Sequence, residues 1–477
     1  MSLFRALDSE TTKRLYASNP SARKILLIAS CLGATVGPIS LSTVTIAIPS
    51  IALEFTADAK TVSWIAMSYI LSTVMFMLPA AKLADIYGRK RFVLLGVLGS
   101  SLLSISCSFM HAAEFLIAIR FLQGFFAAAI FGPGMAILVS VFSGKNRGSA
   151  IGIYAGSVYF SLTISPFIGG WTTEYLGWRA VFWLQVPISL IVLTLFTVLI
   201  RGEWRQQVTQ RFDWVGSIIF GMWAATFVFG LSGLPDTSAF ITLIISLAYL
   251  GLFVWQQGRI KNPLMPVRLL TKNRVFAFSL TASVLMYSVN YPMGFVLSLF
   301  LQFGKGLSPT TAGSVLLVQA AMMAMMAPIA GKISDRFESR RVAAIGILGT
   351  VVGFILISVV ATLSSPWFVL PGLICLGIGF GFFSTPNNSA MLGSVASEDL
   401  GPASAAVNLA RTTGNLIGMS MVALVIYAII GNQQFSFELT GELTRTLYAW
   451  LVVSIVLSLI ASLLCFLRVK ASADIAH

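Results

Sequence analysis

The chain has 477 residues, of which 57% are hydrophobic and only 10% are charged, and its formal net charge at pH 7 is +14. Its mean hydropathy of +0.88 describes more apolar surface than folding alone can remove from water, so composition predicts a membrane protein and excludes an ordinary soluble domain. The positive charge is spread over short loops, which argues against a basic domain that binds nucleic acid.

Apolar runs of about 20 residues, the length that a helix needs to cross the hydrocarbon core, recur along the whole chain. They predict about fourteen transmembrane helices, at residues 25–49, 61–83, 92–110, 113–139, 148–171, 180–200, 213–232, 238–256, 275–301, 310–331, 342–362, 366–389, 403–430 and 447–467.

Two of the predicted loops resemble each other. Residues 81–91 read Ala-Lys-Leu-Ala-Asp-Ile-Tyr-Gly-Arg-Lys-Arg, and residues 331–341 read Gly-Lys-Ile-Ser-Asp-Arg-Phe-Glu-Ser-Arg-Arg. Such a repeat predicts two related membrane halves, as in transporters that rock one bundle against the other. We therefore expect an all-α membrane protein with cytoplasmic tails at 1–24 and 468–477, six-helix bundles at 25–200 and 275–467, and a linker at 201–274 that contains two additional transmembrane helices.

The distribution of basic residues predicts the orientation, because cytoplasmic loops collect Lys and Arg. With the N-terminus inside, nearly all loop Lys and Arg residues fall on the cytoplasmic side, and Lys60, Arg179, Lys305 and Arg445 fall outside. We therefore expect a multi-pass protein of the cytoplasmic (inner) membrane with both termini in the cytoplasm, embedded in the lipid bilayer as a monomer.

Away from the first and last turns of the predicted spans there are two cations, Arg120 and Arg411, and no acid. A guanidinium near the centre of a membrane helix costs about 2.5–3.5 kcal/mol on insertion scales, so Arg120 should face a cavity or a polar partner. For Arg411, a side chain that reaches the cytoplasmic interface is an alternative to the transport path. The predicted substrate-binding residues are polar groups in the spans of both halves: Arg120, Gln123, Tyr159, Tyr287, Asn290, Tyr291, Gln319, Asn387 and Arg411.

The repeated junctions predict conformational latches, because an acid there can cap a helix or pair with a neighbouring arginine. A stripe of small residues followed by a proline in the fifth predicted span suits a pivot, although such stripes also serve plain helix packing. The predicted gating residues are Asp85, Gly88, Arg89, Asp335, Arg336, Pro166, Gly169 and Gly170.

No enzyme is indicated. His111 and His477 are the only histidines, which excludes histidine-based triads and multi-histidine metal sites. The four cysteines lie within apolar runs and have no metal-ligand spacing. No phosphate-binding Gly-x-x-x-x-Gly-Lys-Ser/Thr loop is present, so ATP is not expected as the energy source. We expect no cofactor, and an ion gradient as the source of energy for uphill transport.

Four stretches resemble a known family. Leu83-Ala84-Asp85 with Gly88-Arg89-Lys90 resembles the loop signature of the major facilitator superfamily. Residues 120–124 (Arg-Phe-Leu-Gln-Gly) resemble its intramembrane arginine motif, and residues 161–170 (Ser-Leu-Thr-Ile-Ser-Pro-Phe-Ile-Gly-Gly) resemble its antiporter motif. Residues 177–187 resemble the linker into the sixth helix of the fourteen-helix drug:proton antiporter branch.

The chain also departs from that branch. The first span there usually ends with an acid in a Leu-Asp-x-Thr type of motif, and here the stretch reads Leu41-Ser42-Thr43-Val44-Thr45. An uncharged Ser42 cannot exchange a proton or neutralise a cationic drug. Ala81 replaces the first glycine of the loop signature, and Ser161 and Ser165 stand where the antiporter motif prefers glycine.

The resemblance implies a secondary active transporter that exports hydrophobic or amphipathic small molecules, as in multidrug efflux, by alternating access and in exchange for protons. The unopposed Arg120 and Arg411 favour an alternative, a uniporter or symporter of an anionic metabolite or organic acid. A membrane sensor that does not transport is an alternative of another class, but the short tails offer no output domain.

Overall fold

The computed structural model describes Thr12, Tyr16 and residues 19–142, 145–205, 211–265, 267–360, 365–396 and 400–468. Within these residues every regular element is a helix, and extended backbone pairs only at one isolated bridge between Asp58 and Gln434. Fourteen helices in this part of the chain are long and apolar enough to cross a membrane, which confirms the predicted number of spans.

The helices form two six-span bundles with a pair between them. The first bundle contains α2 (Pro20–Glu54), α3 (Ala59–Tyr87), α4 (Arg89–Cys107), α5 (Ala113–Val141), α6 (Lys145–Leu176) and a sixth span made of α7 (Trp178–Val181), α8 (Gln185–Thr194) and η1 (Leu195–Leu199). The second contains α12 (Arg274–Leu299) with η2 (Phe300–Gly304), α13 (Pro309–Ser334), α14 (Ser339–Val360), η3 (Pro366–Val369), α15 (Leu370–Gly393), α16 (Leu400–Ile430), η4 (Phe437–Leu439) and α17 (Thr440–Leu467). Between them lie α9 (Trp214–Ser232), α10 (Thr237–Arg259) and the short α11 (Val267–Lys272).

Polar residues cap the spans at their first turns. The Asn19 side chain accepts a hydrogen bond from the Ala22 N–H at 3.1 Å, and Pro20 occupies the first helical turn, so α2 begins at Pro20 rather than at residue 25. Asp58 caps α3 and Asp213 caps α9 in the same way, each at 2.8 Å. These side chains satisfy N–H groups that have no partner inside the helix.

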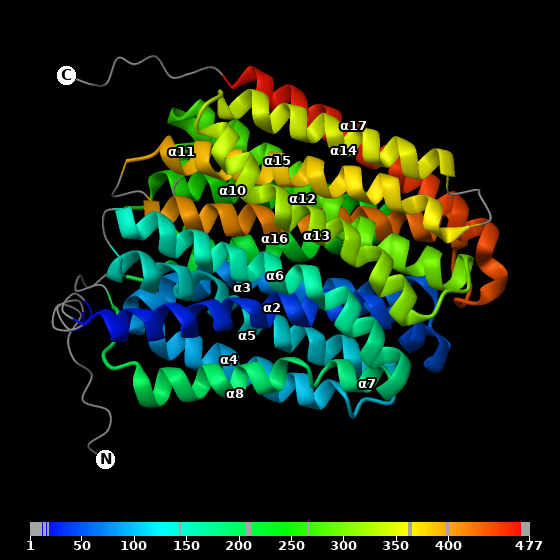
Figure 1. Ribbon diagram of the computed structural model, residues 1–477, viewed down its shortest axis with the longest axis horizontal. Coiled ribbons are helices and arrows are strands. Elements are labelled where there is room, and N and C mark those ends of the chain that lie inside the picture. The colour runs from blue at the N-terminus through cyan, green and yellow to red at the C-terminus, as the bar shows by residue number, and fades with distance from the viewer. Residues whose placement is uncertain are drawn as a thin grey trace.

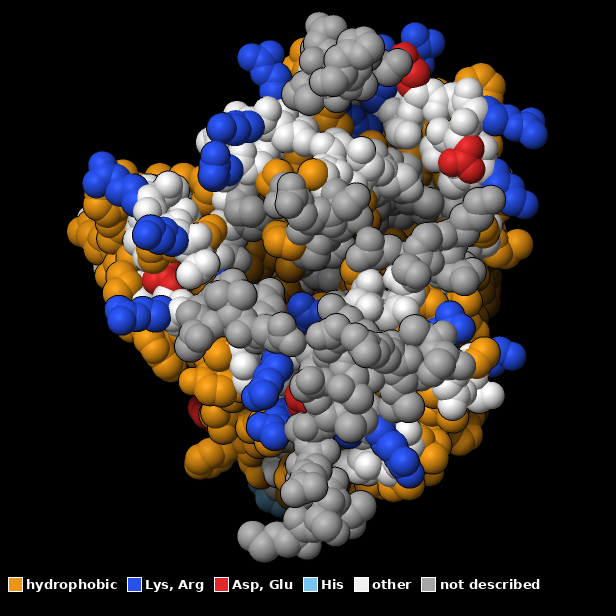
Figure 2. Space-filling model, turned by 90° about the vertical axis from the view of Figure 1, so that its left-hand side faces the viewer, with side chains coloured by type: hydrophobic (Ala, Val, Ile, Leu, Met, Phe, Trp, Pro, Cys, Tyr) orange, Lys and Arg blue, Asp and Glu red, His pale blue; other side chains and the backbone are white. Residues whose placement is uncertain are grey.

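The long helices run roughly parallel to one another, and α2 begins and α17 ends at the same end of the molecule (Figure 1). Lys and Arg side chains surround this end, while hydrophobic side chains cover the flanks (Figure 2). We call it the basic end, and the other the opposite end. The apolar flanks, with exposed residues such as Ile244, Val359 and Val452, are the surface that a bilayer would solvate.

The two bundles meet along two seams. At one seam α6 packs against α13, and at the other α3 packs against α16, where α9 contacts both helices. Glycines allow the first seam to be tight, because a Cβ at Gly313 would collide with the backbone oxygen of Pro166, and a Cβ at Gly170 with the backbone oxygen of Pro309. Close approach through small residues is how membrane helices gain packing energy.

We predict that Gly313→Ala destabilises the protein, because the added methyl group must push α6 and α13 apart. Overpacking of this kind costs about 1–3 kcal/mol. The matched control is Gly251→Ala in α10, where a Cβ would meet no atom within 4 Å. Thermal unfolding of the purified proteins should show a lower midpoint for Gly313→Ala alone. Equal midpoints for both variants would contradict the tight seam.

Candidate functional site

A cavity of about 170 Å³ lies between the two bundles, near the middle of the spans. The first bundle contributes lining residues from α2, α3, α5 and α6, and the second from α12, α13, α15 and α16. Much of the lining is apolar or aromatic, including Leu41, Phe131, Leu162, Met323 and Phe380. Such a surface with a few polar groups is typical of small-molecule sites.

Six of the nine predicted substrate-binding residues line this cavity: Tyr159, Tyr287, Asn290, Tyr291, Gln319 and Arg411. Two hydrogen bonds orient part of this set. The Gln319 amide donates to Asn290 Oδ1 at 3.2 Å, and the Tyr291 hydroxyl lies 3.1 Å from Thr45 Oγ1. The second bond joins α12 to α2 and therefore crosses between the bundles. Whether these side chains contact a substrate stays a prediction.

Arg411, on α16, is the charged residue of the cavity lining. Its Nη2 donates to Asn408 Oδ1 at 3.2 Å, and its Cζ lies 5.9 Å from the centre of the Phe131 ring on α5. Its side chain is half-buried rather than exposed at the basic end. The guanidinium therefore lies in the cavity wall rather than at the interface, and its role in transport stays a prediction.

Arg120 and Gln123 lie behind the cavity wall rather than in it. Arg120 is fully buried, and its guanidinium packs over the ring of Tyr69, with 4.4 Å between Cζ and the ring centre. Tyr69 itself lines the cavity. Arg120 Nη1 donates to Gln123 Oε1 at 2.8 Å and to Ser40 Oγ at 3.2 Å. The polar partner expected for Arg120 is thus present in Gln123, whereas Ser40 and Tyr69 are further contacts that we did not predict.

Asn387 is also remote from the cavity. Its amide donates to the Ser279 backbone oxygen at 3.0 Å and to Ser283 Oγ at 2.9 Å, and its oxygen accepts from Arg468 Nη1 at 3.0 Å. Arg468 follows α17 and is 3% exposed. Both polar functions of the Asn387 side chain are therefore engaged in tying α12, α15 and the end of α17 together.

The cavity is closed toward the opposite end. Among pairs of described residues, the hydrogen bonds between the bundles lie level with the cavity or beyond it toward that end. Ser298 Oγ donates to the Thr45 oxygen at 3.2 Å, and Gln302 Nε2 donates to the Ile46 oxygen at 3.1 Å. At the rim, the Thr310 N–H donates to the Glu174 carboxylate at 3.0 Å. Pro166 lines the cavity, and Gly169 and Gly170 lie on the same helix between it and this rim.

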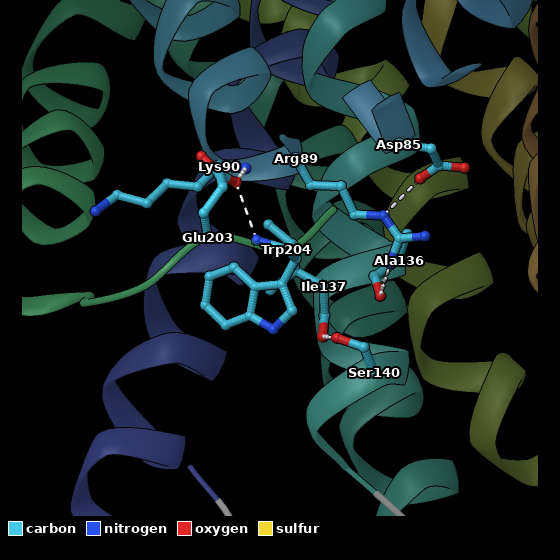
Figure 3. A network of polar contacts seen from close by, with 8 residues as sticks. All are labelled: Asp85, Arg89, Lys90, Ala136, Ile137, Ser140, Glu203 and Trp204. Carbon is cyan, nitrogen blue, oxygen red and sulfur yellow. Dashed lines mark hydrogen bonds and ion pairs between the residues drawn. The ribbon is translucent and has the colours of Figure 1, made fainter. Parts of the chain in front are cut away.

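The first junction connects three elements at the basic end (Figure 3). Asp85, in the last turn of α3, pairs with Arg89 at 2.6 Å across Gly88, whose φ of 122° is readily adopted only by glycine. Arg89 Nη1 also donates to the Ala136 oxygen of α5 at 3.0 Å. The junction thus holds α3, α4 and α5 at fixed positions relative to one another.

Glu203, in the linker after η1, is a member of this junction that sequence reasoning missed. Its carboxylate accepts from the backbone N–H groups of Lys90 at 2.8 Å, Arg91 at 3.3 Å and Trp204 at 3.0 Å, and so caps α4 from a distant segment. Burial raises the pKa of the Glu203 carboxyl above its usual value, and these N–H donors oppose that rise. The feature of the sequence that could have identified Glu203 is its position as an acidic residue in a basic loop, between Arg201 and Arg205.

The second junction is built differently. Asp335 ends α13, and both Asp335 and Arg336 are exposed, without an ion pair among the described residues. The charged contacts there come from Glu338, which pairs with Arg340 at 2.8 Å and with Arg341 at 3.1 Å. The gating roles of Asp335 and Arg336 stay predictions.

Comparisons with known proteins agree with this architecture. The family model described as Major Facilitator Superfamily matches residues 30–419. The multidrug resistance protein Stp of Mycobacterium tuberculosis (strain CDC 1551 / Oshkosh) is 28% identical over 410 residues, which cover 85% of this chain and 76% of that protein. The riboflavin transporter RibZ of Clostridioides difficile (strain 630) is 27% identical over 381 residues, covering 79% and 82%.

A solved structure shares the fold. The crystal structure of a bacterial homolog of the human lysosomal transporter Spinster superposes with a TM-score of 0.66 at 16% identity, and the match covers 94% of this chain and 98% of that one. The predicted architecture, two six-helix bundles with a central pair of additional spans, is therefore confirmed.

We predict that Glu203→Ala lowers the free energy of unfolding by about 1–3 kcal/mol, because partly buried N–H donors of α4 lose their acceptor. Glu438→Ala is the control, since Glu438 is exposed at the opposite end. Chemical or thermal unfolding in detergent measures the difference. A Glu203→Ala protein as stable as the control would show that this cap does not hold the junction.

Proposed function

Because the chain belongs to the Major Facilitator Superfamily, whose model spans residues 30–419, we propose that it exports hydrophobic or amphipathic small molecules by alternating access. The chain is an integral membrane transporter for a small-molecule substrate, and not an enzyme. A relative named for multidrug resistance supports efflux, and a relative named as a riboflavin transporter supports an organic solute of moderate size.

The observation that carries the proposal is the cavity between the bundles. Apolar and aromatic groups dominate its wall, and tyrosines and amides such as Tyr159, Asn290 and Gln319 supply a few hydrogen-bonding groups. This combination suits an amphipathic molecule, because the apolar body is removed from water while the polar groups orient it.

Alternating access requires the contacts at the opposite end to separate while the basic end closes. We propose that the basic end faces the cytoplasm, in accord with its many Lys and Arg residues (Figure 2). The bonds from Ser298 and Gln302 to α2, and the seam at Gly170, would then open toward the exterior. The rigid junction of Asp85, Arg89 and Glu203 would let the first bundle move as one body.

An ion gradient is the proposed energy source. Proton exchange is the coupling that the family resemblance implies. Ser42, which stands where that resemblance places an acid, lines the cavity. The lining contains no carboxylate among the described residues, so proton exchange in this cavity would have to use a different type of group.

We predict that Gly294→Leu strongly slows transport without unfolding the protein. Gly294 lines the cavity and has open space at its Cβ, so a larger side chain fills the site rather than straining the helix. In liposomes loaded with neutral, cationic and anionic amphipathic dyes, we expect the fastest dye to slow by about tenfold or more. Gly251→Leu, with equal open space in α10, is the matched control. Unchanged transport by folded Gly294→Leu would place the pathway elsewhere.

We predict that Asp85→Asn slows transport while expression and thermal stability stay close to wild type. The Asp85–Arg89 pair is partly exposed, with side chains 25% and 19% accessible, so its loss should cost no more than about 1 kcal/mol. The dye assay and an unfolding curve on the same preparation separate the two effects. Wild-type transport kinetics in this variant would remove Asp85 from the gating residues.

A further inference from the structure

The central cavity has an unusual charge balance. Arg411 is the one charged side chain in its lining, which contains no Asp, Glu, Lys or His among the described residues. The acids that the structure describes lie at helix ends, caps and loops, as Glu54, Asp58 and Glu174 do at the opposite end. The cavity is therefore positively charged, without a carboxylate to neutralise it.

The Arg411 guanidinium has N–H donors that are available to a ligand. A guanidinium carries five N–H donors, and the hydrogen bond to Asn408 uses one of them. The neighbouring lining residues on α16, Thr412 and Asn415, are uncharged, and the amide N–H groups of Asn415 are further potential donors. The end of the cavity formed by α16 is thus polar and cationic, which suits a planar or tetrahedral oxyanion.

A second cation stands behind the opposite wall. Arg120 is fully buried, and its Nε and Nη2 have no hydrogen-bond partner among the described residues. Ser40, Gln123 and the Tyr69 ring contact the guanidinium without neutralising its charge. Since Tyr69 forms the wall between Arg120 and the cavity, the field of this cation adds to that of Arg411.

We propose that the cavity binds amphipathic organic anions, with Arg411 contacting a carboxylate or sulfonate group and the aromatic wall holding the apolar body. This inference rests on the proposed function and specifies its substrate class. Each transport cycle then moves one negative charge from the basic end to the opposite end. Because the cell interior is negative, such export runs downhill electrically and requires no proton exchange by the cavity.

Binding to purified protein tests the charge preference. The probes share one apolar body: 1-naphthalenesulfonate, the cation trimethyl(1-naphthylmethyl)ammonium and neutral 1-naphthalenesulfonamide. Calorimetry should show the anion bound at least about tenfold more tightly than the cation. Arg411→Gln should lower that ratio several-fold and leave the neutral probe unchanged, whereas Arg411→Lys should retain more of it. Arg445→Gln, which removes an exposed cation at the opposite end, is the control and should behave as wild type.

Efflux from liposomes tests the driving force. With equal pH on both sides, an inside-negative potassium diffusion potential should accelerate efflux of 1-naphthalenesulfonate several-fold. Equal or tighter binding of the cation, an unchanged ratio in Arg411→Gln, or anion efflux that responds to pH gradients alone would overturn the inference. A protein that moves the amphipathic dyes but neither binds nor moves the naphthalene anion would also overturn it. A protein that moves no solute at all would instead overturn the proposed function.

Discussion

Close contact between α6 and α13 is the constraint on which the arrangement of the two bundles depends. Gly313 lies against the Pro166 backbone and Gly170 against the Pro309 backbone, so no side chain separates the helices at these points. The same segment of α6 contributes Pro166 to the cavity wall. Packing at this seam and the shape of the cavity are therefore determined by the same few residues.

The charge distribution follows from the cost of burying ions in lipid. The described acids serve at the ends of helices, where Asp58 and Asp213 cap α3 and α9, and Glu203 caps α4 from the linker. Burial of Glu203 is tolerated because three backbone N–H groups surround its carboxylate. Because the described acids lie at these positions, the charged side chains in or next to the cavity are Arg411, which lines it, and Arg120, which lies behind Tyr69.

Much of the architecture could be predicted from sequence, because hydrophobic length and repeated junctions are local patterns. The prediction of which residues face the cavity was less accurate, because Arg120, Gln123 and Asn387 do not line it. Tyr159, Tyr287 and Arg411 do line the cavity, but Arg120 lies behind Tyr69. The direction in which a polar residue points depends on how its helix is rotated against its neighbours, and a uniformly apolar span carries little information about that rotation.

Long-range polar contacts were beyond prediction for a related reason. Asn387 is occupied by Ser279, Ser283 and Arg468, which come from distant parts of the chain. Glu203 lies more than a hundred residues from the helix that it caps. No spacing rule connects such partners, so the equivalence of the two junctions in sequence did not reveal that Glu338, rather than Asp335, makes the ion pairs of the second one.

The additional pair of spans makes the two flanks of the molecule unequal. Helix α9 packs over the seam between α3 and α16, with α10 beside it, whereas neither of these two helices covers the seam between α6 and α13, and both α6 and α13 carry exposed apolar residues such as Phe160 and Met325. A compound dissolved among the acyl chains therefore meets a shielded seam on one flank and a bare one on the other. Any lateral entry from the bilayer would therefore use the seam between α6 and α13 and not the seam between α3 and α16.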